Sequence, residues 1–91
     1  MKENILGSLR KKVNRIDRRL MKYLTRRFGI VRMIGEIKGK SGIPIVDKER
    51  EGQILKKIKN LNTDDTTKSA IIKIYECIFD TSYHIEKVEK A

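Results

Sequence analysis

A chain of 91 residues has the length of one small domain, and 22 Lys and Arg against 12 Asp and Glu give it a net charge of +10. It has no apolar run near the ~20 residues that a membrane span needs, and its N-terminus lacks the apolar segment of a secretory signal. We therefore expect a cytoplasmic protein with no place in a membrane. One cysteine and one histidine exclude a disulfide framework and argue against a metal site.

The positive charge is concentrated in the first part of the chain. Residues 1–40 carry 13 basic and 3 acidic side chains, whereas residues 41–91 carry nine of each. All of the net charge therefore belongs to residues 1–40. A block of this kind indicates an anionic partner: nucleic acid, an acidic membrane surface or a small polyanion.

The first predicted element is one long helix that ends before Pro44. Apolar residues recur along it at alternating intervals of three and four, at Leu6, Leu9, Val13, Ile16, Leu20, Tyr23, Ile30, Ile34 and Ile37. This heptad-like seam extends over about 32 residues, which measure roughly 50 Å as a helix. A compact chain of this size has a radius of gyration of ~12 Å and is only ~30 Å across. Since its own chain cannot cover such a helix, we predict a homodimer with long helices side by side.

Two shorter helices are predicted after the loop that contains Pro44. Asp47 is a plausible N-cap for the first, whose apolar face continues through Ile54, Ile58 and Leu61. A polar turn at residues 60–63 precedes the last helix, predicted over residues 65–87. Its inward face is expected to contain Ile71, Ile74, Tyr75, Ile78, Ser82 and Ile85, with Phe79 and Tyr83 as further packing residues.

Two basic residues interrupt the packing face of the long helix. Arg27 takes the seam position between Tyr23 and Ile30, and Lys38 follows eleven residues later, about three turns along nearly the same face. An unpaired charge is very costly to bury, so an inward Arg27 needs a partner. That partner is either a ligand shared with Lys38 or an internal carboxylate such as Glu51.

Polar residues also lie on the packing faces of the two later helices. Asp47 and Glu51 continue the apolar face of the middle helix, with Arg50 beside both, and Ser82 and Glu86 form an i, i+4 pair on the last helix. Each has an ordinary explanation: a cap for Asp47, a solvated surface for Arg50, a bond to its own helix for Ser82, and an exposed helix end for Glu86. Together they predict a mainly cationic pocket inside a helical bundle.

Three segments in this order resemble the all-helical (type II) chorismate mutase family in its free-standing, monofunctional form: LRKKVNRIDRRLMKYLTRR, IGEIKGKSGIPIVDKEREGQIL and IFDTSYHIE. The resemblance extends from about Leu6 to Lys87, so residues 1–91 are expected to form a single domain. It implies an all-α fold with one long N-terminal helix, a short middle helix and a C-terminal helix in an intertwined homodimeric bundle. It also implies two equivalent sites, no cofactor, and conversion of chorismate to prephenate on the route to phenylalanine and tyrosine.

The resemblance further implies roles for individual basic residues. Arg10 corresponds to the arginine that crosses into the partner chain's site. Arg27 and Lys38 correspond to cationic residues that line the site from the same long helix, and both are expected to be catalytic.

The later motifs supply the remaining substrate-binding residues. Asp47, Arg50 and Glu51 match the family's D-x-x-R-E motif, in which the Glu contacts the ring hydroxyl and the other two support that end of the pocket. Ser82 corresponds to a serine near a substrate carboxylate. Glu86 corresponds to a Gln or Glu that faces the ether oxygen, and a Glu there must be protonated to donate to developing negative charge.

Other functions stay open at the level of sequence. One is a lyase of the same fold that removes pyruvate from isochorismate, and the product formed from each substrate separates the two enzymes. A basic helical dimer that binds nucleic acid would give a salt-dependent DNA shift without prephenate. Neither that module nor a coiled-coil-like structural dimer explains Glu51, Ser82 and Glu86 on packing faces.

Overall fold

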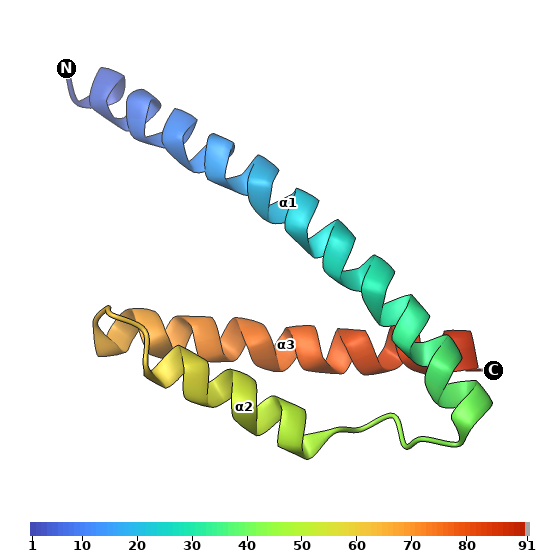
Figure 1. Cartoon of the computed structure of the whole chain (residues 1–91). Helices are drawn as coiled ribbons and strands as arrows, with labels where there is room; N and C mark the ends of the chain where they lie inside the picture. The colour runs from blue at the N-terminus through green and yellow to red at the C-terminus, as the bar shows by residue number, and fades with distance from the viewer. Residues whose placement is uncertain (91) are drawn as a thin grey trace. The chain divides into compact units, whose positions relative to one another are not determined.

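A computed structural model describes residues 1–90 and consists of three helices: α1 (Lys2–Ser41), α2 (Lys48–Lys59) and α3 (Asp65–Lys90) (Figure 1). The described residues contain no strand. The prediction of an all-α chain with a long first helix, a short middle helix and a C-terminal helix is thereby confirmed. At 40 residues α1 is about 60 Å long, which exceeds the predicted length because the helix begins at Lys2, before the apolar seam, and continues beyond it to Ser41.

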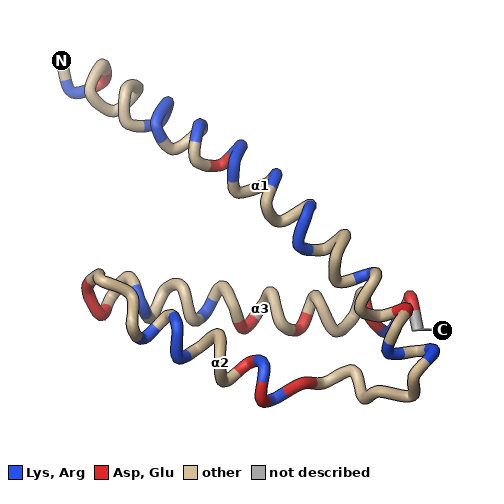
Figure 2. Tube along the Cα trace, in the orientation of Figure 1, with Lys and Arg blue, Asp and Glu red and all other residues tan. Residues whose placement is uncertain are grey.

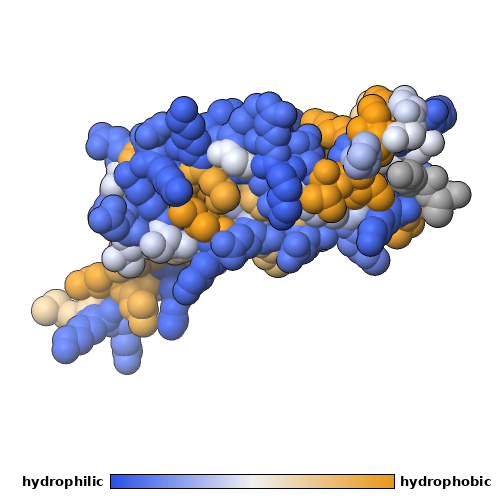
Figure 3. Space-filling view, turned by 90° about the horizontal axis from the view of Figure 1, so that it is seen from below, coloured by the Kyte–Doolittle hydropathy of each residue, from blue (hydrophilic) through white to orange (hydrophobic). Residues whose placement is uncertain are grey.

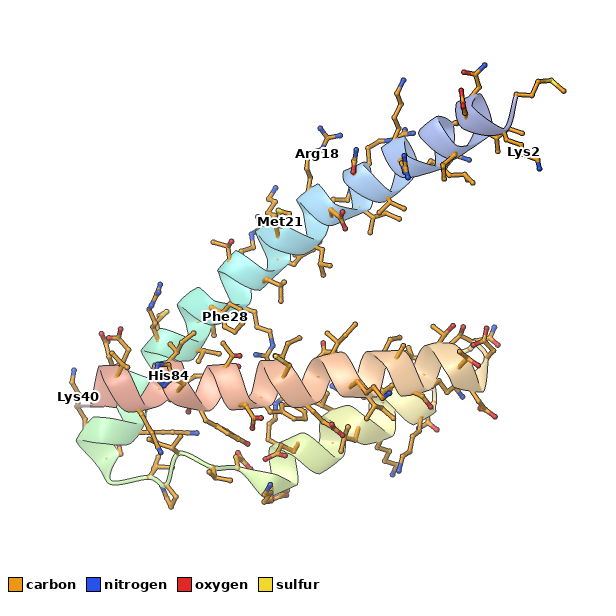
Figure 4. The ribbon with its side chains drawn as sticks, turned by 180° about the vertical axis from the view of Figure 1, so that it is seen from behind. Lys2, Arg18, Met21, Phe28, Lys40 and His84 are labelled. Atoms are coloured by element: carbon orange, nitrogen blue, oxygen red, sulfur yellow. The ribbon has the colours of Figure 1, made fainter. Side chains whose placement is uncertain are left out.

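The structure divides after Ile30 into two units, each of which is described by itself. The first unit is the N-terminal part of α1, where Lys and Arg residues are dense along the chain (Figure 2). Its predicted apolar seam is open to solvent in the single chain, with exposed fractions between 47% and 63% from Leu6 to Tyr23. In Figure 4 the side chain of Arg18 extends away from the helix axis.

The second unit comprises residues 31–90 and contains the last turns of α1 together with α2 and α3. Gly42 ends α1 with a φ of 66°, a left-handed conformation that glycine adopts without strain. The Ile43 N–H donates to the Lys38 carbonyl at 3.1 Å, as in a Schellman motif. The long helix, which was predicted to end before Pro44, therefore ends at Ser41.

Helices α2 and α3 lie side by side and run in opposite directions (Figure 1). Each begins at an aspartate cap: Asp47 Oδ1 accepts from the Arg50 N–H at 2.9 Å, and Asp64 Oδ1 accepts from the Thr67 N–H at 2.6 Å. The hydrogen bonds from Thr67 lower the pKa of Asp64. The predicted N-cap role of Asp47 is thereby confirmed.

The core between α2 and α3 is built on Ile54, Ile58 and Phe79. Partly buried neighbours complete it: Leu55, Ile71, Ile72, Tyr75 and Tyr83. Ile74 was predicted to face inward but is 60% exposed in the chain. The inward face of α3 is centred near Tyr75 and Phe79. Ile74 directly precedes Tyr75, and because adjacent helix positions differ by about 100°, its side chain points away from the core. None of the described helices is long and apolar enough to cross a membrane.

The last turns of α1 pack against α3 at Gly35. A Cβ added to Gly35 would lie 2.8 Å from the Cα of Glu86 and 2.9 Å from its carbonyl oxygen. Val31, one turn earlier, is 6% exposed and belongs to the same buried face of α1. Because real Cβ atoms do not approach backbone this closely, only glycine permits the observed spacing of the two helices at this point.

Replacing Gly35 by alanine is expected to lower the free energy of unfolding by about 1–3 kcal/mol, because the new methyl group overpacks a contact with rigid backbone. Gly52 on α2 is the matched control, since its added Cβ would meet nothing within 4 Å. Gly52→Ala is expected to gain up to ~1 kcal/mol from better helix propensity. Urea unfolding followed by circular dichroism measures both changes. A gain in stability for both variants would contradict a tight contact at Gly35.

Candidate active site

A buried ion pair joins the end of α1 to α3. Lys38 Nζ lies 2.5 Å from Glu86 Oε1, and the two side chains are only 12% and 5% exposed. Lys38 Nζ also donates to the carbonyl oxygen of Ile45 at 2.7 Å. Lys38 follows Gly35 by about one turn, so the close approach of α1 to α3 at Gly35 brings the ammonium group to Glu86.

The ion pair is costly to bury, which makes it a candidate functional feature. Two charges removed from water lose hydration, and their attraction offsets this loss only with very good geometry and further hydrogen bonds. Glu86 Oε1 is buried, and no donor among the described residues makes an aligned hydrogen bond to it, although the ammonium of Lys38 is in contact. Buried polar atoms in this state call for an explanation such as a catalytic or binding role.

Ser82 lies one turn before Glu86 on α3 and is 5% exposed. The pair therefore shares a buried face of the helix, as the i, i+4 spacing predicts. Glu86 itself is 4% exposed, so the alternative interpretation of an exposed residue near a helix end is wrong.

The first turn of α2 carries the D-x-x-R-E motif. The backbone N–H of Glu51 donates to the Asp47 carbonyl at 3.1 Å, and the Asp47 side chain caps the helix as described above. Glu51 is partly buried, and its Oε2 lies 3.5 Å from the ammonium of Lys48, a side chain that is 81% exposed. Arg50 is exposed in the single chain.

Tyr83 connects this turn to α3 and was missed as a polar residue by sequence reasoning. Its hydroxyl donates to Glu51 Oε2 at 2.5 Å and accepts from the Asp47 N–H at 3.3 Å. Burial first, and then the hydrogen bond to the Glu51 carboxylate, raise the pKa of Tyr83 from 10.0 to about 12. No local pattern indicated this bridge, because Glu51 lies 32 residues away along the chain.

The predicted site residues of the second unit thus form two polar groups that share α3. One contains Lys38 and Glu86, and the other contains Asp47 and Glu51, held by Tyr83. Tyr83 and Glu86 are three residues apart, so the two groups meet α3 within one turn of each other. A buried ammonium, a buried carboxyl group and an oriented carboxylate are suited to binding a small molecule that carries both charges and hydroxyl groups.

Two predicted site residues belong to the first unit. Arg10 is exposed and Arg27 is partly buried. Lys38, Asp47, Glu51 and Glu86 belong to the second unit, so the contribution of the two arginines to the same pocket stays a prediction.

Residues 9–87 match the family model of chorismate mutase type II, and the chain belongs to that family. The chorismate mutase of Methanocaldococcus jannaschii is 32% identical over 83 residues, which are 90% of this chain and 84% of that protein. The resemblance that the three sequence segments indicated is thereby confirmed.

Bifunctional relatives contain the same region as a smaller part of a longer chain. The bifunctional chorismate mutase/prephenate dehydratase of Aquifex aeolicus is 36% identical over 90% of this chain, and its counterpart from Buchnera aphidicola is 33% identical over 93%. The chain spans only 24% and 22% of the lengths of these two proteins. No solved structure matches the chain significantly.

Proposed function

We propose that the protein catalyses the intramolecular rearrangement of chorismate to prephenate, without a cofactor. The observation that carries the proposal is the buried pair of Lys38 and Glu86, in a chain whose residues 9–87 match the chorismate mutase type II family. Neither the lyase nor the nucleic-acid alternative has comparable support, because the relatives are named as chorismate mutases or as bifunctional proteins that include one.

The chemistry of the substrate fits a site of this composition. Chorismate is a dianion with two carboxylates, a ring hydroxyl and an enol-ether oxygen, and its rearrangement is a pericyclic reaction within one molecule. The protein must therefore select a compact conformer in which the reacting carbons are close, and arginines that hold both carboxylates serve this purpose. We assign this task to Arg27 and, across the dimer, to Arg10, with Ser82 near one carboxylate.

The protein must also stabilise the charge that develops when the C–O bond breaks. Negative charge develops on the ether oxygen as the bond stretches, and donors already in place stabilise it without reorganisation. The Lys38 ammonium, held by the Ile45 carbonyl, is one such donor. Glu86 is the second donor when its carboxyl group carries a proton, and the ion pair with Lys38 must then open so that both groups donate to the oxygen. Glu51 accepts from the ring hydroxyl, while Asp47 and Arg50 support that end of the pocket.

A second copy of the chain is part of the proposal. The apolar seam from Leu6 to Tyr23 is solvent-exposed in the single chain, although its heptad-like spacing is that of helices that pair lengthwise. Burial of this seam against a partner's helix would remove a large apolar surface from water, as expected for an obligate dimer. Arg10 lies between Leu9 and Val13 along this helix and would reach the partner's site.

Purified protein is expected to consume chorismate and to form a product that acid converts to phenylpyruvate. Lys38→Ala should lower kcat by about 10²–10³-fold, the usual cost of removing one donor to a developing oxyanion. Lys57→Ala, which removes an exposed lysine of α2, is the matched control and should leave turnover unchanged. Pyruvate formation from isochorismate, with chorismate untouched, would contradict the mutase assignment and favour the lyase.

Glu86→Ala is expected to lower kcat for chorismate by about 10²–10³-fold, because it removes one of the two donors to the developing negative charge. Glu86→Gln keeps the shape of the side chain and supplies an amide donor, so it should retain far more activity than Glu86→Ala. The measurement is kcat of both variants beside the wild type, in one buffer. Equal losses in the two variants would contradict a donor role for Glu86.

Mixed dimers test whether a site is shared between chains. Arg10→Ala and Arg50→Ala should each abolish most activity, because each removes a group from both sites of its homodimer. In a mixed dimer, one site receives the intact Arg10 of one chain and the intact Arg50 of the other. About half of the wild-type activity should return when differently tagged chains are co-expressed and the mixed dimer is isolated. Purified mixed dimers without recovered activity would contradict a shared site.

A further inference from the structure

The hydroxyl of Tyr83 bridges two helices at the candidate site. It donates to Glu51 Oε2 at 2.5 Å and accepts from the Asp47 N–H at 3.3 Å, so one atom contacts both the N-cap and the carboxylate of the D-x-x-R-E motif. A hydroxyl carries one proton, and the shorter distance assigns it to Glu51 rather than to the Asp47 carbonyl at 3.4 Å.

The bridge uses one oxygen of the Glu51 carboxylate. Tyr83 and Lys48 both contact Oε2. Both contacts are made by the same oxygen, and the Glu51 side chain as a whole is 17% exposed. An ionised carboxylate has only acceptor sites, so its other oxygen, Oε1, can accept from a hydroxyl group.

The orientation of Glu51 depends on this bridge. Glutamate has several rotatable bonds, and a partly exposed side chain on the first turn of a helix has freedom to point into solvent. The contact with Lys48 restrains it little, because Lys48 is 81% exposed and surface ion pairs are weak. Tyr83 comes from the neighbouring helix, and its ring belongs to the core cluster with Ile54 and Phe79.

Protonation of the phenol also suits this role. Burial and the adjacent carboxylate raise the pKa of Tyr83 to about 12, so the hydroxyl remains a donor throughout the neutral range. Loss of the phenol proton therefore does not interrupt the bridge near neutral pH.

We propose that Tyr83 is a positioning residue that fixes the Glu51 carboxylate so that Oε1 accepts a hydrogen bond from the ring hydroxyl of the substrate. The proposal rests on the proposed function and deepens it, since it makes Tyr83 a determinant of specificity for a hydroxylated ring. Tyr83 itself does not touch the substrate. Its effect is expected only on substrates that present the hydroxyl group.

The test compares two substrates in one variant. Tyr83→Phe removes the bridging oxygen and leaves the packed ring in place. It should lower kcat/KM for chorismate about tenfold, the scale of a lost hydrogen bond to a charged group. An analogue in which hydrogen replaces the ring hydroxyl should react equally well with the wild type and the variant. Tyr75→Phe is the matched control, because Tyr75 also packs in the core against Phe79, and it should change neither substrate.

Each outcome decides the proposal. An equal loss on both substrates would mean that Tyr83 acts only on the fold, and no loss on chorismate would mean that Glu51 needs no orienting group; both overturn it. In a Glu51→Ala background, Tyr83→Phe should have no further effect on chorismate, because the two residues act through one contact. Failure of the proposed function looks different, since the wild-type protein would then convert neither substrate.

Discussion

The backbone contact between Gly35 and Glu86 sets how closely the end of α1 approaches α3 in the second unit. A side chain on α1 at this point would push the two helices apart, and the glycine lets them approach until a Cβ would clash at 2.8 Å. Lys38 follows by about one turn and therefore reaches Glu86 within an interior where water is scarce. The apolar residues beside the contact, such as Val31, exclude water from it (6% exposed). The absence of a side chain at Gly35 thus allows the ion pair between Lys38 and Glu86 to form about one turn away.

The same region shows how α3 organises both polar groups. Ser82, Tyr83 and Glu86 occupy one stretch of this helix, with Glu86 directed to α1 and Tyr83 directed to the first turn of α2. Figure 3 shows that hydrophobic side chains also lie on the surface, between hydrophilic ones. Stability from packing alone would favour apolar residues at positions 82 and 86, because a buried ion pair is often no more stabilising than a hydrophobic replacement. Their polar character is what the proposed role in substrate binding requires.

Local features of this fold follow from the sequence, whereas contacts between distant residues do not. The cap at Asp47 was predicted correctly, because a cap depends on a few neighbouring residues. The inward position of Glu86 followed from its spacing on the apolar stripe. By contrast, the role of Gly35 depends on a helix 51 residues away, and the bridge from Tyr83 depends on a turn 32 residues away. Ile74 was assigned to the wrong face because an apolar residue beside the stripe cannot be distinguished by pattern from one within it.

The exposed apolar seam of α1 bears both on the basic character of residues 1–40 and on pairing with a second copy of the chain. An isolated helix gains little stability from its own hydrogen bonds, so a helix of 40 residues depends on burial of an apolar face. Within the first unit that face is exposed, and the basic residues lie on the remaining surface, where they keep the helix hydrated and attract anions. A second copy would cover the seam without burying most of this charge. Under the proposed function, the excess of positive charge in residues 1–40 would then comprise two populations: outer residues that steer a dianion toward the protein, and a few inward residues that bind it.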